Sequence, residues 1–178
     1  MFPVFYMASV FKTMGMALGG YDDQYLTLIG SLGSVANGLS RIMWGTMQDK
    51  TGFVAIYKVI IVVELVVFSL LPYIVEENKY LYLMAIFAGY LCLGAHFVIF
   101  PNCVIAIFGL RSSVQLSSFI YVTRCVSALS GMFISKALND RLGDQTYSVM
   151  FWTSCVFILI SAFLLIFLFD EKPIRRCK

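Results

Sequence analysis

The eight residues Gly45-Thr46-Met47-Gln48-Asp49-Lys50-Thr51-Gly52 form a short polar hinge between two long apolar stretches. The chain around this 45–52 segment does not resemble a water-soluble protein, because 60% of the residues are hydrophobic and only 13% are charged. Soluble domains carry about 25% charged residues. The sequence therefore predicts an all-α integral membrane protein, since helices satisfy their own backbone hydrogen bonds in lipid.

The apolar runs predict one transmembrane domain over residues 1–178. A spanning helix needs about 20 mainly apolar residues, so the chain has room for about six spans and no separate soluble domain. The expected spans are 2–18, 25–46, 54–75, 80–102, 114–137 and 147–169, with a tail at 170–178. The first run is short, contains Pro3 and Lys12, and lacks the cationic leader of a signal peptide. We interpret it as a truncated span.

Basic residues are distributed unevenly between the alternate loops, and this predicts the orientation. The set that includes the 45–52 segment and the tail contains Lys50, Lys58, Arg111, Lys172, Arg175, Arg176 and Lys178. The opposite set contains Lys12, Lys79 and Arg141 together with Asp22, Asp23, Glu76, Glu77, Asp140 and Asp144. Because Lys and Arg are retained on the cytoplasmic side of short loops, the C-terminus is expected in the cytoplasm. The net charge of +3 reflects this basic face and gives no indication of nucleic acid.

Three charged residues lie near the centre of the predicted spans, where a charge costs at least about 2.5 kcal/mol and usually has a function. Arg41 lies about 12 Å along its helix from Asp49, and Arg124 about 18 Å beyond Ser112, at 1.5 Å per residue. Both arginines are therefore expected near the midplane. Glu64 is the third, and its helical neighbours form no polar stripe; it is either protonated or paired with another helix.

Each arginine belongs to a stripe of small and polar residues at helical spacing, which predicts that both faces point inward. The first stripe is Gly30, Ser34, Asn37, Gly38, Arg41 and Gly45, and the second is Ser117, Tyr121, Arg124, Ser127, Ala128 and Gly131. Two inward guanidinium groups need acidic partners or a wet cavity that holds an anion. A small organic anion would accept bidentate hydrogen bonds from them. The alternative is that one arginine snorkels or bonds to backbone carbonyls.

No enzyme, cofactor or metal site is expected. His96 shares a face with small residues and titrates in a range that suits proton coupling, although a satisfied structural histidine is the simpler interpretation. No acidic or histidine cluster accompanies it to form a metal site. The five cysteines show no metal-ligand spacing and are interpreted as small packing residues: Cys92, Cys103, Cys125, Cys155 and Cys177.

At the level of motifs, Gly45-x-x-x-Asp49-Lys50-x-Gly52 resembles the signature loop of the major facilitator superfamily. The run over residues 37–45, Asn-Gly-Leu-Ser-Arg-Ile-Met-Trp-Gly, resembles the eighth helix of its oxalate/formate antiporter-like branch. Phe100-Pro101, Phe108-Gly109 and Tyr121-x-x-Arg124 are similar to the tenth and eleventh helices. The resemblance covers essentially the whole chain, but only the C-terminal six-helix half of a twelve-helix transporter.

This resemblance implies roles for several residues. Gly45 would allow close helix packing, Asp49 would hold a cytoplasmic gate, Lys50 takes the basic position, and Gly52 is the final glycine of the motif. Phe53 stands where the family often has further basic residues. Arg41 and Arg124 fall where oxalate transporters bind carboxylates, with arginine in place of lysine at the second position. Tyr121 and His96 are expected to line the same site.

The resemblance also implies a missing partner, because alternating access needs two bundles around a central site. The chain is then a truncated gene model, one half of a split transporter, or a half that dimerises. The leading hypothesis is alternating-access transport of a small mono- or dicarboxylate by a major facilitator half in the lipid bilayer. The alternative is a non-transporting structural subunit of a membrane complex that retains the fold.

Overall fold

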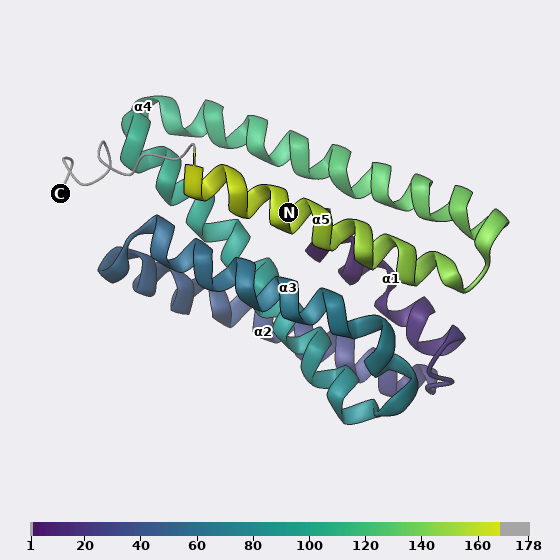
Figure 1. The fold of residues 1–178 in the computed structure, drawn as a ribbon. Coiled ribbons are helices and arrows are strands. Elements are labelled where there is room, and N and C mark those ends of the chain that lie inside the picture. Colours follow the sequence, from purple (N-terminus) through teal and green to yellow (C-terminus); the bar gives the residue numbers. More distant parts are fainter. Residues whose placement is uncertain (1, 168–178) are drawn as a thin grey trace.

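The computed structural model describes residues 2–167, and within this range all regular secondary structure is helical (Figure 1). The helices are α1 (Phe2–Ala17), α2 (Asp23–Thr51), α3 (Phe53–Glu77), α4 (Lys79–Leu142) and α5 (Gln145–Phe167). The all-helical part of the prediction is confirmed. The expected tail at 170–178, with Cys177, lies outside the described residues.

Helix α4 contains a sharp break at Gly109. Its 64 residues would extend about 96 Å if they were straight, but Gly109 has φ 75° and ψ 168°, which is not helical. A positive φ of this kind is readily available only to glycine. In Figure 1 the ribbon of α4 turns back at this point, at the upper left. We expected a connection over residues 103–113; instead the chain stays helical on both sides of one glycine.

Among residues 2–167, three helices are long and apolar enough to cross a membrane: α3, α4 and α5. Helix α1 has 16 residues, fewer than the about 20 that a span needs. Helix α2 has 29 residues, but Gly, Ser, Asn and Arg reduce its hydropathy. Six spans therefore remain a prediction. The break at Gly109 divides α4 into two helical segments, 79–108 and 110–142.

The 45–52 segment is not a loop. Helix α2 continues through Thr51, and Gly52 alone interrupts the path into α3, with φ 90° and its N–H donating to the carbonyl of Gln48. Our expectation that the helix ends near Thr46 was wrong, because the segment has no proline and Gln48 is buried among neighbouring helices. The polar residues thus lie on the last turns of a helix.

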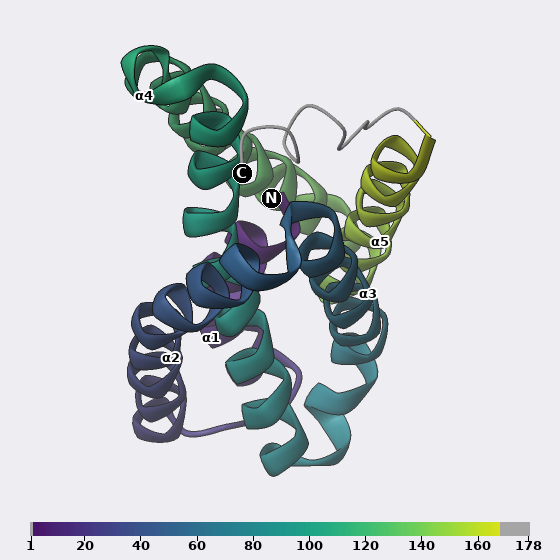
Figure 2. The same ribbon diagram turned by 90° about the vertical axis from the view of Figure 1, so that its left-hand side faces the viewer.

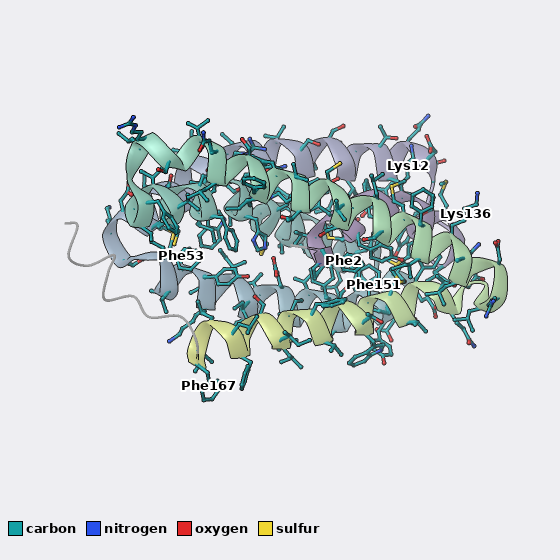
Figure 3. All side chains as sticks on the ribbon, turned by 90° about the horizontal axis from the view of Figure 1, so that it is seen from above. Phe2, Lys12, Phe53, Lys136, Phe151 and Phe167 are labelled. Carbon is teal, nitrogen blue, oxygen red and sulfur yellow. The ribbon has the colours of Figure 1, made fainter. Side chains whose placement is uncertain are left out.

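The turn at Gly52, the break at Gly109 and the end of α5 lie at one end of the molecule, at the left of Figure 1 and nearest the viewer in Figure 2. In Figure 3 the side chains of Phe53 and Phe167 lie at this same end of the molecule, and those of Lys12 and Lys136 lie at the opposite end. Helices therefore run from end to end, and the predicted basic loops share one end. Which side of the membrane this end faces remains a prediction.

The most extensive helix contact is between α2 and α4. Gly94 makes this close approach possible, because a Cβ atom there would lie 2.5 Å from the Asn37 carbonyl oxygen and would overlap the Ser40 hydroxyl. Helix α3 packs against both α4 and α5, and α1 fills the space beside α4. Large side chains such as Tyr6, Tyr82 and Phe68 are fully buried in this core. The close α2–α4 contact places Arg41 beside α4.

Candidate anion-binding site

Arg41 and Arg124, from different helices, lie over the same aromatic ring. The guanidinium carbon of Arg41, on α2, is 4.5 Å from the centroid of the Phe97 ring on α4. The guanidinium carbon of Arg124, on the second segment of α4, is 4.8 Å from the same centroid. The two cations are therefore closer together than about 10 Å, the screening length at 0.1 M salt. The sequence-predicted pair is brought together, and Phe97 is the residue that both contact.

Arg124 is held in place by α4 on both sides of the break. Its side chain is buried, with 4% of the residue exposed, and Nη2 donates a hydrogen bond of 2.5 Å to the main-chain carbonyl of His96. The guanidinium carbon also lies 4.7 Å from the ring centroid of Tyr121. Cation–π contacts of this kind contribute about 0.5–2 kcal/mol. Arg124 is thus fixed by the neighbours of Phe97.

Aromatic residues surround the arginine pair. The ring of Tyr121 stacks on Phe97 at 6.5 Å between centroids, and Phe5 of α1 meets Phe97 edge to face at 5.9 Å. Phe97 is therefore held between α1 and the second segment of α4. This keeps the ring from rotating away from the two guanidinium groups.

The stripe predicted on α2 is not the face by which this helix packs within the chain. Arg41, Ser34 and Gly38 are exposed, and nothing lies within 4 Å of a Cβ atom built at Gly38. The face that packs against α1 and α4 is shifted along the helix surface: Leu26, Ile29, Gly33, Ala36, Ser40, Trp44 and Gln48. The predicted stripe therefore looks away from the core of this chain. The second stripe is partly buried, at Arg124 and Gly131, whereas Tyr121 is 44% exposed.

Two like charges on one ring create a cationic patch that suits a carboxylate. Guanidinium groups donate paired N–H bonds whose geometry matches the two oxygens of a carboxylate. The quadrupole of Phe97 offsets part of the repulsion between the cations but removes none of their charge. Arg41 is exposed whereas Arg124 is buried, so a ligand would reach the patch from the side of Arg41.

Glu64 has the partner that sequence reasoning left open. Its Oε1 lies 2.5 Å from Nε2 of His96, and the two side chains are 4% and 1% exposed. The acid is thus paired with the histidine, and the imidazole of His96 engages α3 while its carbonyl accepts from Arg124. His96 is placed next to the site through its backbone, not as an exposed lining residue.

The carboxyl group also reaches a cavity of about 200 Å³ between α1, α3 and α5. Its lining combines apolar side chains with Glu64 and the hydroxyls of Tyr57 and Ser161, which are hydrogen-bonded to each other at 2.7 Å. Water occupies about 30 Å³ per molecule in the liquid, so several molecules fit. The cavity is distinct from the surface that carries Arg41.

The expected gating residues lie at the C-terminal end of α2. Gly45 approaches Val98, whose Cγ1 would be 3.3 Å from an added Cβ atom, while Asp49 and Lys50 are exposed. Between them, the buried Gln48 side chain donates to the Ile99 carbonyl at 3.1 Å. Packing in this region therefore depends on Gln48, which the signature does not include.

Two further residues strengthen the contact between α2 and α4 and were not predicted. Asn102 donates to the Gln48 side-chain carbonyl at 3.2 Å, and the Trp44 indole donates to the Leu91 carbonyl at 3.0 Å. A sequence signal exists for Trp44 and Gln48, which lie four residues apart on one helical face. Phe97 had no such signal, since it is one of 16 phenylalanines.

Within residues 2–167, no group of three or more His, Cys, Asp or Glu side chains is placed to hold a metal ion. The cysteines in this range are free thiols: Cys92, Cys103, Cys125 and Cys155.

Comparison with known proteins gives two distant relatives. No family model matches the chain, and no solved structure matches it. It is 25% identical over 143 residues to apicoplast pyruvate carrier 1 of Toxoplasma gondii, covering 80% of this chain and 26% of the relative. It is 24% identical over 135 residues to the oxalate:formate antiporter of Oxalobacter formigenes, covering 76% of this chain and 31% of the relative.

The chain spans about a third or less of the length of these two relatives. Both are carriers, not enzymes, and the ions in their names are carboxylates. Together with the long apolar helices, the similarity indicates an integral membrane protein related to carboxylate carriers.

Proposed function

We propose that this chain is part of a membrane carrier for small mono- or dicarboxylates, with Arg41 and Arg124 as the substrate ligands. The observation that carries the proposal is the convergence of two guanidinium groups from α2 and α4 on the ring of Phe97. Two distant relatives named as pyruvate and oxalate:formate carriers support the substrate class.

In this carrier each arginine has a different part. Arg124 is anchored by the His96 carbonyl and by Tyr121, so it provides a fixed positive charge. Arg41 is exposed and can adjust to the anion. Tyr121, also exposed, lies beside Arg124 and would line the substrate site. A monocarboxylate would bridge the two arginines, whereas a dicarboxylate would place one carboxylate on each.

Transport by alternating access requires a second bundle facing this patch. We propose that the chain acts as a half or fragment of a major facilitator transporter, with an N-terminal half or a second half-transporter opposite the exposed face of α2. Gly45, Asp49, Lys50 and Gly52, near the end of α2 and its turn, would then form the gate between the halves. The exposed position of Asp49 and Lys50 is compatible with contacts to such a partner.

The test is binding and uptake of labelled pyruvate and oxalate. The purified full chain is placed in nanodiscs for binding, and it is co-expressed with any second half for uptake into proteoliposomes. Arg41→Ala and Arg124→Ala should each reduce binding about tenfold to 100-fold, the effect of losing charge-assisted hydrogen bonds of about 1.5–3 kcal/mol. Arg124→Lys should recover only part of the loss, because lysine lacks the planar pair of donors.

Arg141→Ala is the matched control, since Arg141 is an exposed arginine near the end of α4, away from Phe97. Its binding should equal that of the unmodified protein. The proposal is wrong if Arg41→Ala and Arg124→Ala, shown to be folded by thermal unfolding, both bind and transport carboxylates at the original level.

A further inference from the structure

We infer that Glu64 and His96 form a proton-binding site, separate from the arginine pair, and that the proton held there sets the affinity of the anion patch. The second half of this inference rests on the proposed function; the proton site itself does not. The evidence is the geometry of the pair, the cavity beside it, and the connection from His96 to Arg124.

The pair has two protonation states that keep its hydrogen bond. Oε1 of Glu64 and Nε2 of His96 are 2.5 Å apart, so one proton must lie between them. With this proton alone, a carboxylate accepts from a neutral imidazole and the pair carries one negative charge. A second proton makes the pair neutral, either as carboxylate with imidazolium or as carboxylic acid with imidazole.

The second proton has a defined place. A proton taken up at Oε2 of Glu64 gives a carboxylic acid whose Oε1 still accepts from Nε2–H of His96, and Nδ1, which has no hydrogen-bond partner among the described residues, stays unprotonated. Proton uptake therefore leaves the Glu64–His96 contact intact and breaks no other protein hydrogen bond. The 1% exposure of His96 means that the proton must arrive through Glu64.

Glu64 is the route to water because it lines the cavity of about 200 Å³. The hydroxyls of Tyr57 and Ser161 line the same cavity and are hydrogen-bonded to each other, which provides polar groups that can orient water. A carboxylate at such a wall can accept a proton from solvent while its other contact stays on His96.

Few charged or titratable groups surround the Glu64–His96 pair, so the charge of the pair affects the electrostatic potential at Arg41 and Arg124. On α3 the neighbour is Tyr57, whose ring is 6.0 Å from the His96 ring. Helix α4 contributes Arg124 and also Cys92, one turn before His96. Helix α2 contributes Arg41, beside Phe97. The described cavity lining from α1 is Phe2 and Pro3, and that from α5 is Phe157, Ile158 and Ser161, none of them titratable.

The link to the anion patch is direct. The carbonyl of His96 accepts the hydrogen bond from Arg124. The next residue, Phe97, has the ring that the guanidinium groups of both Arg41 and Arg124 contact. When the pair is negative, it offsets part of the positive potential of the arginines. When a proton neutralises it, the full potential of two cations acts on the anion, and binding strengthens. Proton and anion therefore bind cooperatively, and each favours the other.

The first experiment tests the proton site without any transport assay. His96 is the single histidine of the chain, so ¹⁵N-histidine NMR of the full chain in nanodiscs reports on it alone. The ring nitrogens should shift in one step between about pH 5 and pH 8, because Nε2–H donates to a carboxylate above the step and to a neutral carboxyl group below it. In Glu64→Gln, which keeps a polar side chain but cannot bind the proton, the step should vanish or move by about one pH unit or more.

Glu76→Gln is the matched control, since Glu76 is an exposed acid on the same helix, and its step should equal that of the unmodified protein. The proton site is wrong if His96 shows no step in this range, or if Glu64→Gln titrates as the unmodified protein does.

The second experiment tests the coupling, with pyruvate as the probe because it stays ionised throughout this range. Pyruvate should bind the unmodified protein about tenfold more tightly below the His96 step than above it. Glu64→Gln should bind with the tighter affinity at every pH, because its pair is permanently neutral.

The outcomes separate the two claims. Binding that is equally tight on both sides of the His96 step contradicts the coupling but leaves the carboxylate site in place. Absence of pyruvate and oxalate binding at every pH contradicts the proposed function, while the NMR titration still decides the proton site.

Discussion

The Glu64–His96 pair and the Arg41–Arg124 pair both place ionisable side chains within apolar helices, but they are compensated in opposite ways. The acid and the histidine are of opposite character, almost fully buried, and hydrogen-bonded to each other. The two arginines have the same charge and share the Phe97 ring, and Arg41 is exposed whereas Arg124 is buried. The first pair is satisfied within the chain, whereas the second offers its charge to a ligand.

This difference shows how the same rare residue types divide between stability and function. Removing one member of a satisfied buried pair leaves the other uncompensated, which is costly for folding. Removing an exposed cation from a like-charged pair relieves repulsion and costs little stability. Mutations at the two pairs should therefore have contrasting effects, and this contrast can be measured.

The largest effect on stability is expected for His96→Ala. The substitution leaves the Glu64 carboxyl without its partner and should reduce the free energy of unfolding by about 3 kcal/mol. Arg41→Ala should change it by less than about 1 kcal/mol. Reversible unfolding in mixed micelles, followed by tryptophan fluorescence, measures both.

The double variant Glu64→Leu with His96→Leu serves as the control for this prediction. It replaces the pair by apolar groups of similar volume, so its stability should return to within about 1 kcal/mol of the unmodified protein. Equal losses for His96→Ala and Arg41→Ala would remove the contrast between the two pairs.

Sequence reasoning found the charged residues but not their contacts. Arg41, Glu64 and Arg124 are conspicuous because charges are rare in apolar helices. The pairing of Glu64 with His96 depends on the rotation of α3 against α4, which tertiary packing sets and local periodicity does not encode. The face of α2 that packs within the chain could not be identified for the same reason: small residues permit close packing but do not specify which face has a partner.

Helix ends were predicted less well than helix positions. The end of α2 extends to Thr51 because Gln48 is buried and donates a hydrogen bond to Ile99. From its polarity alone, Gln48 is expected in a loop. The connection expected over 103–113 reduces to Gly109, since glycine alone can reverse the chain there with a positive φ. In both places a side-chain or backbone contact across helices overrides the local polarity of the sequence.

A smaller effect is expected for Gly94→Ala, which tests the contact that brings Arg41 to Phe97. The added Cβ atom would overlap the Ser40 hydroxyl and lie 2.5 Å from the Asn37 carbonyl oxygen, so α2 and α4 must separate. The expected loss of unfolding free energy is about 1–3 kcal/mol, together with weaker pyruvate binding as Arg41 moves from the ring.

Gly38→Ala is the matched control for Gly94→Ala. It lies on the same α2–α4 pair of helices, but nothing is within 4 Å of an added Cβ atom, and alanine is the better helix former by about 1 kcal/mol. Stability should therefore stay the same or rise. A loss at Gly38 as large as that at Gly94 would show that the exposed face of α2 is packed after all.

The smallest effect on stability is expected for Phe97→Leu, which sharpens the comparison at the arginine pair itself. Leucine keeps an apolar side chain but removes both cation–π contacts, each of about 0.5–1 kcal/mol at an exposed site. The guanidinium groups then repel without the compensation from the ring and spread apart. Pyruvate binding should weaken about threefold to tenfold, with a loss of stability near 1 kcal/mol.

Phe119→Leu removes an exposed phenylalanine from the same helix, 70% accessible in the isolated chain, and should leave pyruvate binding unchanged. If Phe97→Leu weakened unfolding as much as His96→Ala while pyruvate binding stayed the same, Phe97 would be a core residue only. The two pairs would then both serve stability, and the shared ring would not be what organises an anion site.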